Sequence, residues 1–331
     1  MGIMGLFRKT PQNESPATTI QSFDIGQQAE EKAKENKKRD DASIRSANGL
    51  TVGEILLLHY CLQGAYPNPK GGYPQFWHSD YGMDHVDAIL KSLEKREFIR
   101  FALPKELVST LKTDQLKEIL SEIGQKTTGK KNDLIDRINQ YAEDTVLRKY
   151  FTETKYTLTG KGKKELSDNE YVPYLHAHKK YGITVWEANQ VIRKNPDRLY
   201  RDLIWGIFNQ HQQEAMSPWN QGIYRNTKYS MAEFLMDEKR YSDAISLLGG
   251  VCYMDVVLHP DYIPYDQFTD LLAPDAVTRL KKCKEEAKLS KDDLFQRLQK
   301  EFSRYNYPGR TINISDQDLA GLLVAAIENE L

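Results

Sequence analysis

A group of cations surrounds one predicted helix start near the middle of the chain. The residues that can contact a phosphate there are Lys126, Thr127, Thr128, Gly129, Lys130, Lys131 and Arg137. A helix start presents free backbone N–H groups and the positive end of the helix dipole, and both favour a bound phosphate. Arg137 follows Lys130 by seven residues, so both side chains project from one side of the helix. The predicted chemistry is salt-dependent contact with a nucleic-acid backbone, which carries little base information.

Two short amphipathic helices must hold these cations. In the first, which follows a predicted N-cap at Thr113, the apolar stripe consists of Leu116, Ile119, Leu120 and Ile123. Gly124 supplies a left-handed stop for this helix. The second helix starts at Lys130, and the residues it is predicted to bury are Leu134, Ile135, Ile138 and Tyr141. The same pattern also fits a solvated lysine-rich turn, so the residues alone leave both interpretations open.

The segment 103–143 also follows a known family pattern. The positions that match it are Leu111, Leu116, Leu120 and Gly124, followed by Gly129-Lys130-Lys131, Leu134-Ile135 and Arg137-Ile138. This pattern resembles the SAP family, a helix-extended-helix module that binds DNA. The family usually has an apolar residue after the helix-ending glycine, where this chain has Gln125. The resemblance implies binding of double-stranded DNA, AT-rich duplex included, through the cations at the second helix start.

The flanking segments 49–102 and 153–168 carry a second pattern. We expect a helix capped by Thr51, a helix over 86–95, and strands over 98–102 and 155–158. The matching positions are Leu90, Leu93, Glu94, Lys95, Arg96 and Ile99, then Tyr156, Leu158, Thr159, Gly162 and Leu166. They resemble the two halves of a winged-helix domain, with Glu97 where that family has glycine. The resemblance implies that the SAP-like module is inserted in the wing, where an insertion costs little loop-closure entropy.

The winged-helix resemblance implies a second DNA contact on the recognition helix and the strand after it. The candidate residues are His85, Lys91, Lys95 and Arg100. Acidic residues such as Asp84 would face outward beside them and weaken entry into a major groove. A winged helix that reads DNA and one that makes only protein contacts therefore remain equal alternatives.

The two ends of the chain have contrasting compositions. Residues 1–48 are rich in Gln, Ser, Thr and Pro and then in mixed charges, which predicts a flexible arm. Residues 171–331 are predicted as an α-helical domain. Its expected features are helix starts at 195–197 and 217–218, a tetratricopeptide-type helix pair over 230–248, helices over 274–288, 290–305 and 315–331, and a turn with a short strand over 306–315. Such a domain either packs passively, recruits an unknown protein partner or self-associates.

Composition restricts the compartment and the partners. The formal net charge is -1, so nucleic-acid contact must come from local patches. No apolar run approaches the ~20 residues of a membrane span, which predicts no membrane contact. Cys61, Cys252 and Cys283 are far apart and odd in number, which favours a reduced, cytoplasmic protein without a structural zinc site.

Motifs for catalysis are not found in the sequence. There is no nucleophile elbow, Walker loop, dinucleotide fingerprint or zincin helix. His176, His178, His211 and Cys252 are candidate metal ligands only in principle, since no acidic residue stands near the histidine pair. The tryptophans Trp77, Trp186, Trp205 and Trp219 can stack on bases, but packing explains them more simply. We expect no enzyme, no cofactor and no metal.

These observations predict a mostly α (α+β) fold. It comprises a winged-helix-like domain with a SAP-like hairpin in the wing, followed by the helical domain. The leading hypothesis is a cytoplasmic, phage-like DNA-binding adaptor or regulatory protein. The alternative is a protein-interaction or assembly component that does not touch nucleic acid, which the near-neutral net charge and the large helical part also fit.

Overall fold

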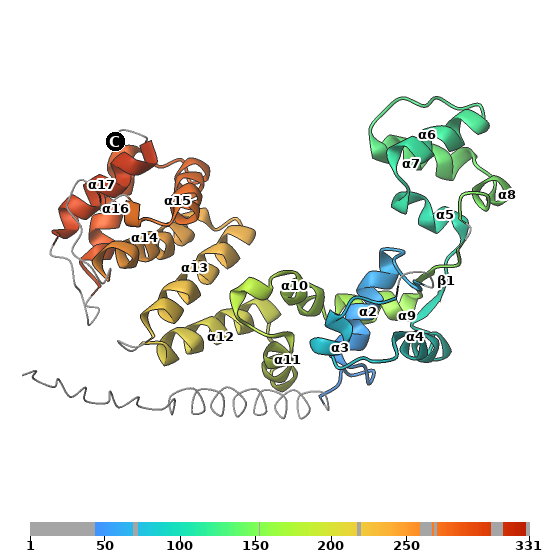
Figure 1. Ribbon diagram of the computed structural model, residues 1–331, viewed down its shortest axis with the longest axis horizontal. Coiled ribbons are helices and arrows are strands. Elements are labelled where there is room, and N and C mark those ends of the chain that lie inside the picture. Colours follow the sequence, from blue (N-terminus) through green and yellow to red (C-terminus); the bar gives the residue numbers. More distant parts are fainter. Residues whose placement is uncertain are drawn as a thin grey trace, which may run out of the picture.

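The computed structural model describes residues 44–68, 72–151, 153–216, 220–258, 267, 270–305 and 314–328. Within these ranges the fold is mostly helical and contains one two-stranded antiparallel sheet, as the sequence predicts. Figure 1 shows a central group that includes α2, α4 and α9, a module of α6 and α7 raised on one side, and a helical unit from α13 to α17 on the other. Each of these three groups has its own cluster of buried apolar residues.

The central group is built around α2 (Val52–Leu62), which is buried on most of its surface. Thr51 and Glu54 form a reciprocal capping box, because the N–H of each donates to the side chain of the other. The other helical elements of this group are α3 (Phe76–Ser79), α4 (Val86–Lys95), α9 (Gly160–Ser167), α10 (Tyr171–Ala177), the 3-10 turn η2 (Lys179–Tyr181), α11 (Val185–Lys194) and α12 (Tyr200–Glu214). The predicted helix over 86–95 is therefore confirmed.

The sheet joins the central group to the raised module. Its strands are β1 (Ile99–Phe101) and β2 (Tyr156–Leu158), which pair with Ile99 opposite Leu158. The Phe101 ring stacks on that of Tyr156, with ring centroids 4.8 Å apart. Both predicted strands are confirmed, and the chain between them forms the module. The likeness to a winged-helix domain itself stays a prediction.

The module consists of short helices around a small separate core. Its elements are α5 (Pro104–Leu107), η1 (Val108–Thr110), α6 (Thr113–Glu122), α7 (Lys131–Tyr141) and α8 (Asp144–Leu147). The buried residues are Val108, Leu111, Leu116, Ile119, Leu120, Leu134, Ile138, Ala142 and Leu147. The predicted burial of Tyr141 is wrong, because its side chain is 52% exposed and Ala142 and Leu147 close the core instead. The N-cap of α6 is Lys112 and not Thr113.

The C-terminal unit is a bundle of helices around the third core. Its elements are α13 (Gln221–Asp237), α14 (Tyr241–Val257), α15 (Pro274–Glu286), α16 (Lys291–Phe302) and α17 (Asp316–Glu328). The predicted helix pair over 230–248 exists as part of the longer α13 and α14, which turn at Lys239 with φ 59°. Ser290 caps α16 through its hydroxyl, which accepts a hydrogen bond from the Asp293 N–H.

Two predicted domain boundaries do not match the division of the cores. Residues 171–208 were predicted in the helical domain, but α10, α11 and α12 bury Leu175, Ala188 and Phe208 in the central core. Residues 44–48 were predicted in the flexible arm, yet the Ile44 carbonyl accepts a hydrogen bond of 3.2 Å from Asn189 Nδ2. Composition did not reveal these contacts because they join residues more than 100 positions apart.

One predicted helix start is misplaced. The segment 195–198 forms a turn, and α12 begins only at Tyr200 with Leu199 as its N-cap. The predictions for 1–43, the start at 217–218, Trp219, the turn and strand over 306–313 and the last residues 329–331 lie outside the described residues. Among the helices that are described, none is long and apolar enough to cross a membrane.

Candidate nucleic-acid interface

The candidate interface is the start of α7 together with the segment 124–130 that leads into it. Lys130 is the N-cap residue, with φ -69° and ψ 159°, and its carbonyl accepts the first helical hydrogen bond from Leu134 N–H at 3.2 Å. The Lys130 N–H donates to Asp133 Oδ2 at 2.9 Å, which is the backward half of a capping box. A lysine cannot accept from the first-turn N–H groups, so those of residues 131–133 point outward from the helix start.

Gly129 makes this cap possible. Its φ of 137° lies in the left-handed half of conformational space that side chains disfavour. A Cβ at this position would lie 3.1 Å from Asp133 Oδ2 and 3.2 Å from Asp133 Cβ. Glycine therefore lets the Asp133 carboxylate fold back against the chain and fix the direction in which residues 126–130 approach the helix. Asp133 was not among the predicted site residues, although an acid three positions after an N-cap is a recognisable signal.

The other end of the connection is fixed by the stop of α6. Gly124 has φ 68°, its N–H donates to Ser121 O at 3.1 Å, and the Gln125 N–H donates to Leu120 O at 2.7 Å. These two bonds form a Schellman motif, which satisfies the last carbonyls of the helix. Gln125 stands where an apolar contact usually completes that motif, and the hydrogen bonds form without it.

Arg137 contributes to the interface differently from the prediction. Its Nη1 donates to the carbonyl of Lys126 and lies 3.4 Å from the carbonyl of Thr128. The guanidinium thus ties the connection to α7 from within the module. Its position seven residues after Lys130 suggested an outward contact, but two carbonyls of the preceding segment lie within its reach. Arg137 is therefore a positioning residue for the lysines.

The three lysines remain available for a ligand. Lys126, Lys130 and Lys131 are exposed, and none forms an ion pair with a carboxylate of the described chain. Thr127 is half-buried and Thr128 is exposed beside them. The structure therefore brings the predicted residues together around one helix start. The Asp133 carboxylate accepts a hydrogen bond from the Lys130 N–H, which directs it at the backbone.

The second predicted contact set is arranged differently. His85, Lys91, Lys95 and Arg100 are all exposed. Arg100 forms two bonds with the Glu106 carboxylate, from Nη2 to Oε1 at 2.6 Å and from Nη1 to Oε2 at 2.8 Å. Arg100, the last of these four residues before the module in the sequence, is thus neutralised by a carboxylate of the same chain. Asp84, next to His85, is in turn paired with His78.

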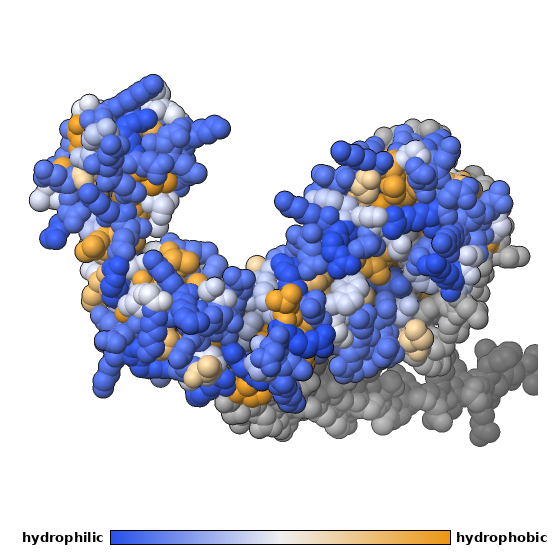
Figure 2. All heavy atoms as spheres, turned by 180° about the vertical axis from the view of Figure 1, so that it is seen from behind, coloured by the Kyte–Doolittle hydropathy of each residue, from blue (hydrophilic) through white to orange (hydrophobic). Residues whose placement is uncertain are grey.

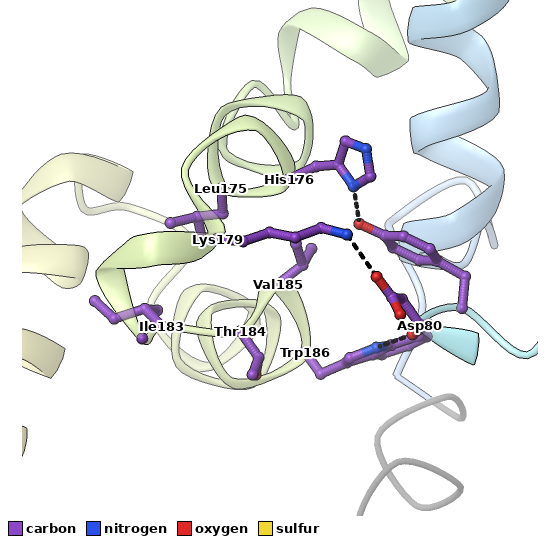
Figure 3. Close-up of a pocket in the computed structure, with 10 residues that line it drawn as sticks. Asp80, Leu175, His176, Lys179, Ile183, Thr184, Val185 and Trp186 are labelled. Carbon is purple, nitrogen blue, oxygen red and sulfur yellow. Dashed lines mark hydrogen bonds and ion pairs between the residues drawn. The ribbon is translucent and has the colours of Figure 1, made fainter. Parts of the chain in front are cut away.

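The histidines considered as metal ligands have structural partners. His176 lies beside a cavity of about 250 Å³ lined also by Asp80, Lys179 and Trp186 (Figure 3). Its Nδ1 bonds to the Tyr81 hydroxyl at 2.9 Å, and burial lowers the pKa of the imidazole. His178 instead meets Asp237 at 3.2 Å, an acidic partner from α13 that the local sequence did not reveal.

The remaining candidates for chemistry are also engaged in packing. His211 bonds to Glu187 at 2.7 Å. Trp77 is buried and donates to the Tyr66 hydroxyl, and Trp186 donates to the Asp80 carbonyl. In the part of the chain that is described, no group of three or more His, Cys, Asp or Glu side chains is arranged to hold a metal ion.

Comparison with protein families agrees with the geometry of the module. A family model described as SAP domain matches residues 107–143, which span α6, α7 and the connection between them. The C-terminal half remains unassigned. No curated protein and no solved structure shows significant similarity to the chain. The SAP match indicates nucleic-acid binding in general, and it falls on the segment that carries the exposed lysines.

Proposed function

We propose that this chain is a DNA-binding adaptor or regulatory protein that holds duplex DNA, AT-rich duplex included, through its SAP module. Lys126, Lys130 and Lys131 contact phosphates beside the start of α7, and the free N–H groups of the first turn add a second source of attraction. Binding of this kind is directed mainly at the phosphate backbone and discriminates weakly between sequences. The proposal includes a cytoplasmic location and assigns the chain no catalytic reaction.

One observation carries the proposal. The stretch that matches the SAP family model, residues 107–143, also contains three exposed lysines at one helix start with no carboxylate partner among the described residues. On a chain of formal net charge -1, such a local excess of positive charge supports a specific site for an anion. Arg137, Gly129 and Asp133 support this site by fixing the segment that carries the lysines.

The test is the double variant Lys130→Glu with Lys131→Glu. We expect it to lose at least about 100-fold in affinity for AT-rich duplex at low salt, since two charge-assisted contacts become repulsive. Glutamates at a helix start interact favourably with the helix dipole, so α7 itself should persist. Electrophoretic shift and circular dichroism measure the two properties.

The matched control is Lys117→Glu on α6. Lys117 is an exposed lysine of the same module, away from the start of α7. We expect this variant to bind within about threefold of the wild type, which is the range of surface charge effects. Unchanged binding by the double variant would remove the proposal.

A second candidate function is a protein-interaction or assembly component. The C-terminal unit favours it, because this unit has its own core and none of its helices takes part in the SAP module. Leu199, 74% exposed at the start of α12, and Ile223, 58% exposed on α13, offer apolar contacts for a partner or a second copy. This candidate predicts a stable complex in sedimentation experiments and no salt-sensitive affinity for DNA.

A further inference from the structure

A second group of cations lines a cavity far from the SAP module. The cavity has a volume of about 410 Å³ and lies where η2, α13 and α15 meet. Its acidic and basic lining residues are His178, Lys180, Glu233, Asp237, Arg279 and Lys282. Two lysines and one arginine therefore face two carboxylates, and they come from segments about 100 residues apart. No local pattern in the sequence predicts this group.

The two carboxylates of the cavity are already engaged. Glu233 is buried, and its Oε1 accepts from Lys180 Nζ at 2.6 Å and from Arg279 Nε and Nη2 at 2.9 and 2.6 Å. Asp237 Oδ2 accepts from the hydroxyls of Tyr174 and Tyr181, each at 3.0 Å. Internal donors thus engage Asp237 Oδ2 and Glu233 Oε1, whereas Glu233 Oε2 is buried without a hydrogen-bond partner in the described part of the chain. Lysine has three N–H donors and arginine has five, so Lys180 and Arg279 each keep N–H groups that do not bond to Glu233.

Lys282 completes the cavity and is not part of this network. It is exposed, and it forms no ion pair with any carboxylate that the structure describes. The cavity therefore combines Lys282, which has no ion pair among the described residues, with Lys180 and Arg279, which have further N–H donors. A phosphate group matches such a lining, because it can accept from several cationic donors at once.

The position of the cavity relates it to the SAP module. Figure 2 shows a deep hollow between two raised parts of the molecule, and Figure 1 identifies them as the module and the C-terminal unit. α13 and α15, whose residues line the cavity, lie on the side of the C-terminal unit toward the hollow. α8, which follows the end of α7, lies on the outer side of the module, so the start of α7 is directed toward the hollow.

We propose that the cavity formed by Lys180, Arg279 and Lys282 is a second phosphate contact for the same DNA duplex that the SAP module holds. This inference rests on the proposed function and extends it. The duplex lies across the hollow, with the start of α7 on one side and α15 on the other. A duplex must then exceed a certain length before it can reach both sites.

The experiment compares the salt dependence of binding on a short and a long duplex, using the full chain. A duplex of about 10 base pairs is ~34 Å long and one of about 40 base pairs is ~136 Å long. The variant is Lys282→Ala, which leaves the Glu233 network intact. The matched control is Lys281→Ala, the neighbouring lysine on α15, which does not line the cavity.

We expect Lys282→Ala to reduce the slope of log affinity against log salt by about 0.9 on the long duplex, the value for one lost phosphate contact. On the short duplex it should bind like the wild type, and Lys281→Ala should leave both slopes unchanged. The inference is overturned if Lys282→Ala has the wild-type slope on the long duplex, if Lys281→Ala has the same effect, or if the short duplex shows the same reduction. A cavity that serves a protein partner gives the first of these results.

The same titrations separate this inference from the proposed function. If Lys130→Glu with Lys131→Glu abolishes binding while Lys282→Ala has the wild-type slope on both duplexes, only the inference of a second phosphate contact is wrong. If the double variant binds both duplexes with the wild-type slope, the proposed function itself fails.

Discussion

The start of α7 and strand β1 both carry exposed cations but place them in different surroundings. At α7, Lys130 and Lys131 are exposed without a carboxylate partner in the described chain, and the nearby Asp133 is directed at the backbone. At β1, Arg100 is held by both oxygens of Glu106. Basic side chains are thus exposed at both places, and the difference lies in the pairing.

This difference explains why a cation pattern alone is a weak guide to a binding surface. A paired guanidinium must break its ion pair with the carboxylate before it can contact a phosphate. Replacing one ion pair by the other changes the net free energy little. An unpaired lysine beside a helix start gives up only water and counterions, and counterion release favours binding. The comparison therefore predicts that the two regions respond differently to substitution.

Among single substitutions in the two regions, the largest effect is expected for Gly129→Ala at the start of α7. The new Cβ would lie 3.1 Å from Asp133 Oδ2. The alanine would also have to adopt a φ of 137°, which strains the backbone by about 1–3 kcal/mol. We expect a roughly tenfold loss of DNA affinity, because the direction of residues 126–130 changes. Titration with labelled duplex measures this loss.

Gly124→Ala is the control for that substitution. It imposes a left-handed residue on the same module at φ 68°, but a Cβ there meets no atom within 4 Å. We expect it to lower the free energy of unfolding of the module by about 1 kcal/mol and to leave DNA affinity unchanged. Equal losses of affinity in the two variants would contradict the assigned role of Gly129.

A smaller effect is expected for Glu97→Gly at the end of α4. Glu97 has φ 63°, and its N–H donates to Glu94 O in the turn that ends the helix. Glycine at this position removes the Cβ penalty of about 1 kcal/mol, so the free energy of unfolding of the central group should rise by that amount. Denaturant unfolding measures the gain, while DNA affinity should not change. A loss of stability would show that the Glu97 side chain makes a stabilising contact that outweighs the cost of its positive φ.

The smallest effect is expected for Arg100→Ala. The hydrogen bonds from Arg100 lower the pKa of the Glu106 carboxyl, so this carboxylate stays charged at neutral pH. The pairing is lost only as the pH falls through that lowered pKa. At neutral pH we therefore expect DNA affinity within about twofold of the wild type, as for an exposed ion pair. A loss as large as that of Gly129→Ala would place β1 in the DNA interface and end the contrast between the two regions.

Local patterns in the sequence predicted the elements of the module and the gathering of its lysines. The stripe of Leu116, Ile119 and Leu120, the stop at Gly124 and the lysines at 130 and 131 all act within one or two helical turns. Local spacing is sufficient for such features because the hydrogen bonds involved join residues three to five positions apart. The same reasoning located α4, both strands and the helix over 290–305.

Contacts between distant segments could not be predicted in this way. The role of Arg137 depends on carbonyls 9 and 11 positions away, and Asn189 contacts Ile44 across 145 positions. The cavity around Lys282 also requires three helical segments to meet. Leu175 and Phe208 have the spacing of ordinary helix stripes, which does not say which core they join.

The most direct test of the account is the salt dependence of the wild-type chain on a short duplex that reaches only the SAP module. Three lysines at the start of α7 predict a slope of log affinity against log salt of about -2.7, since each phosphate contact contributes about -0.9. Arg100, which is held by Glu106, should add nothing to this value. A slope near zero, or no binding at low salt, would contradict the claim that these lysines hold a phosphate backbone.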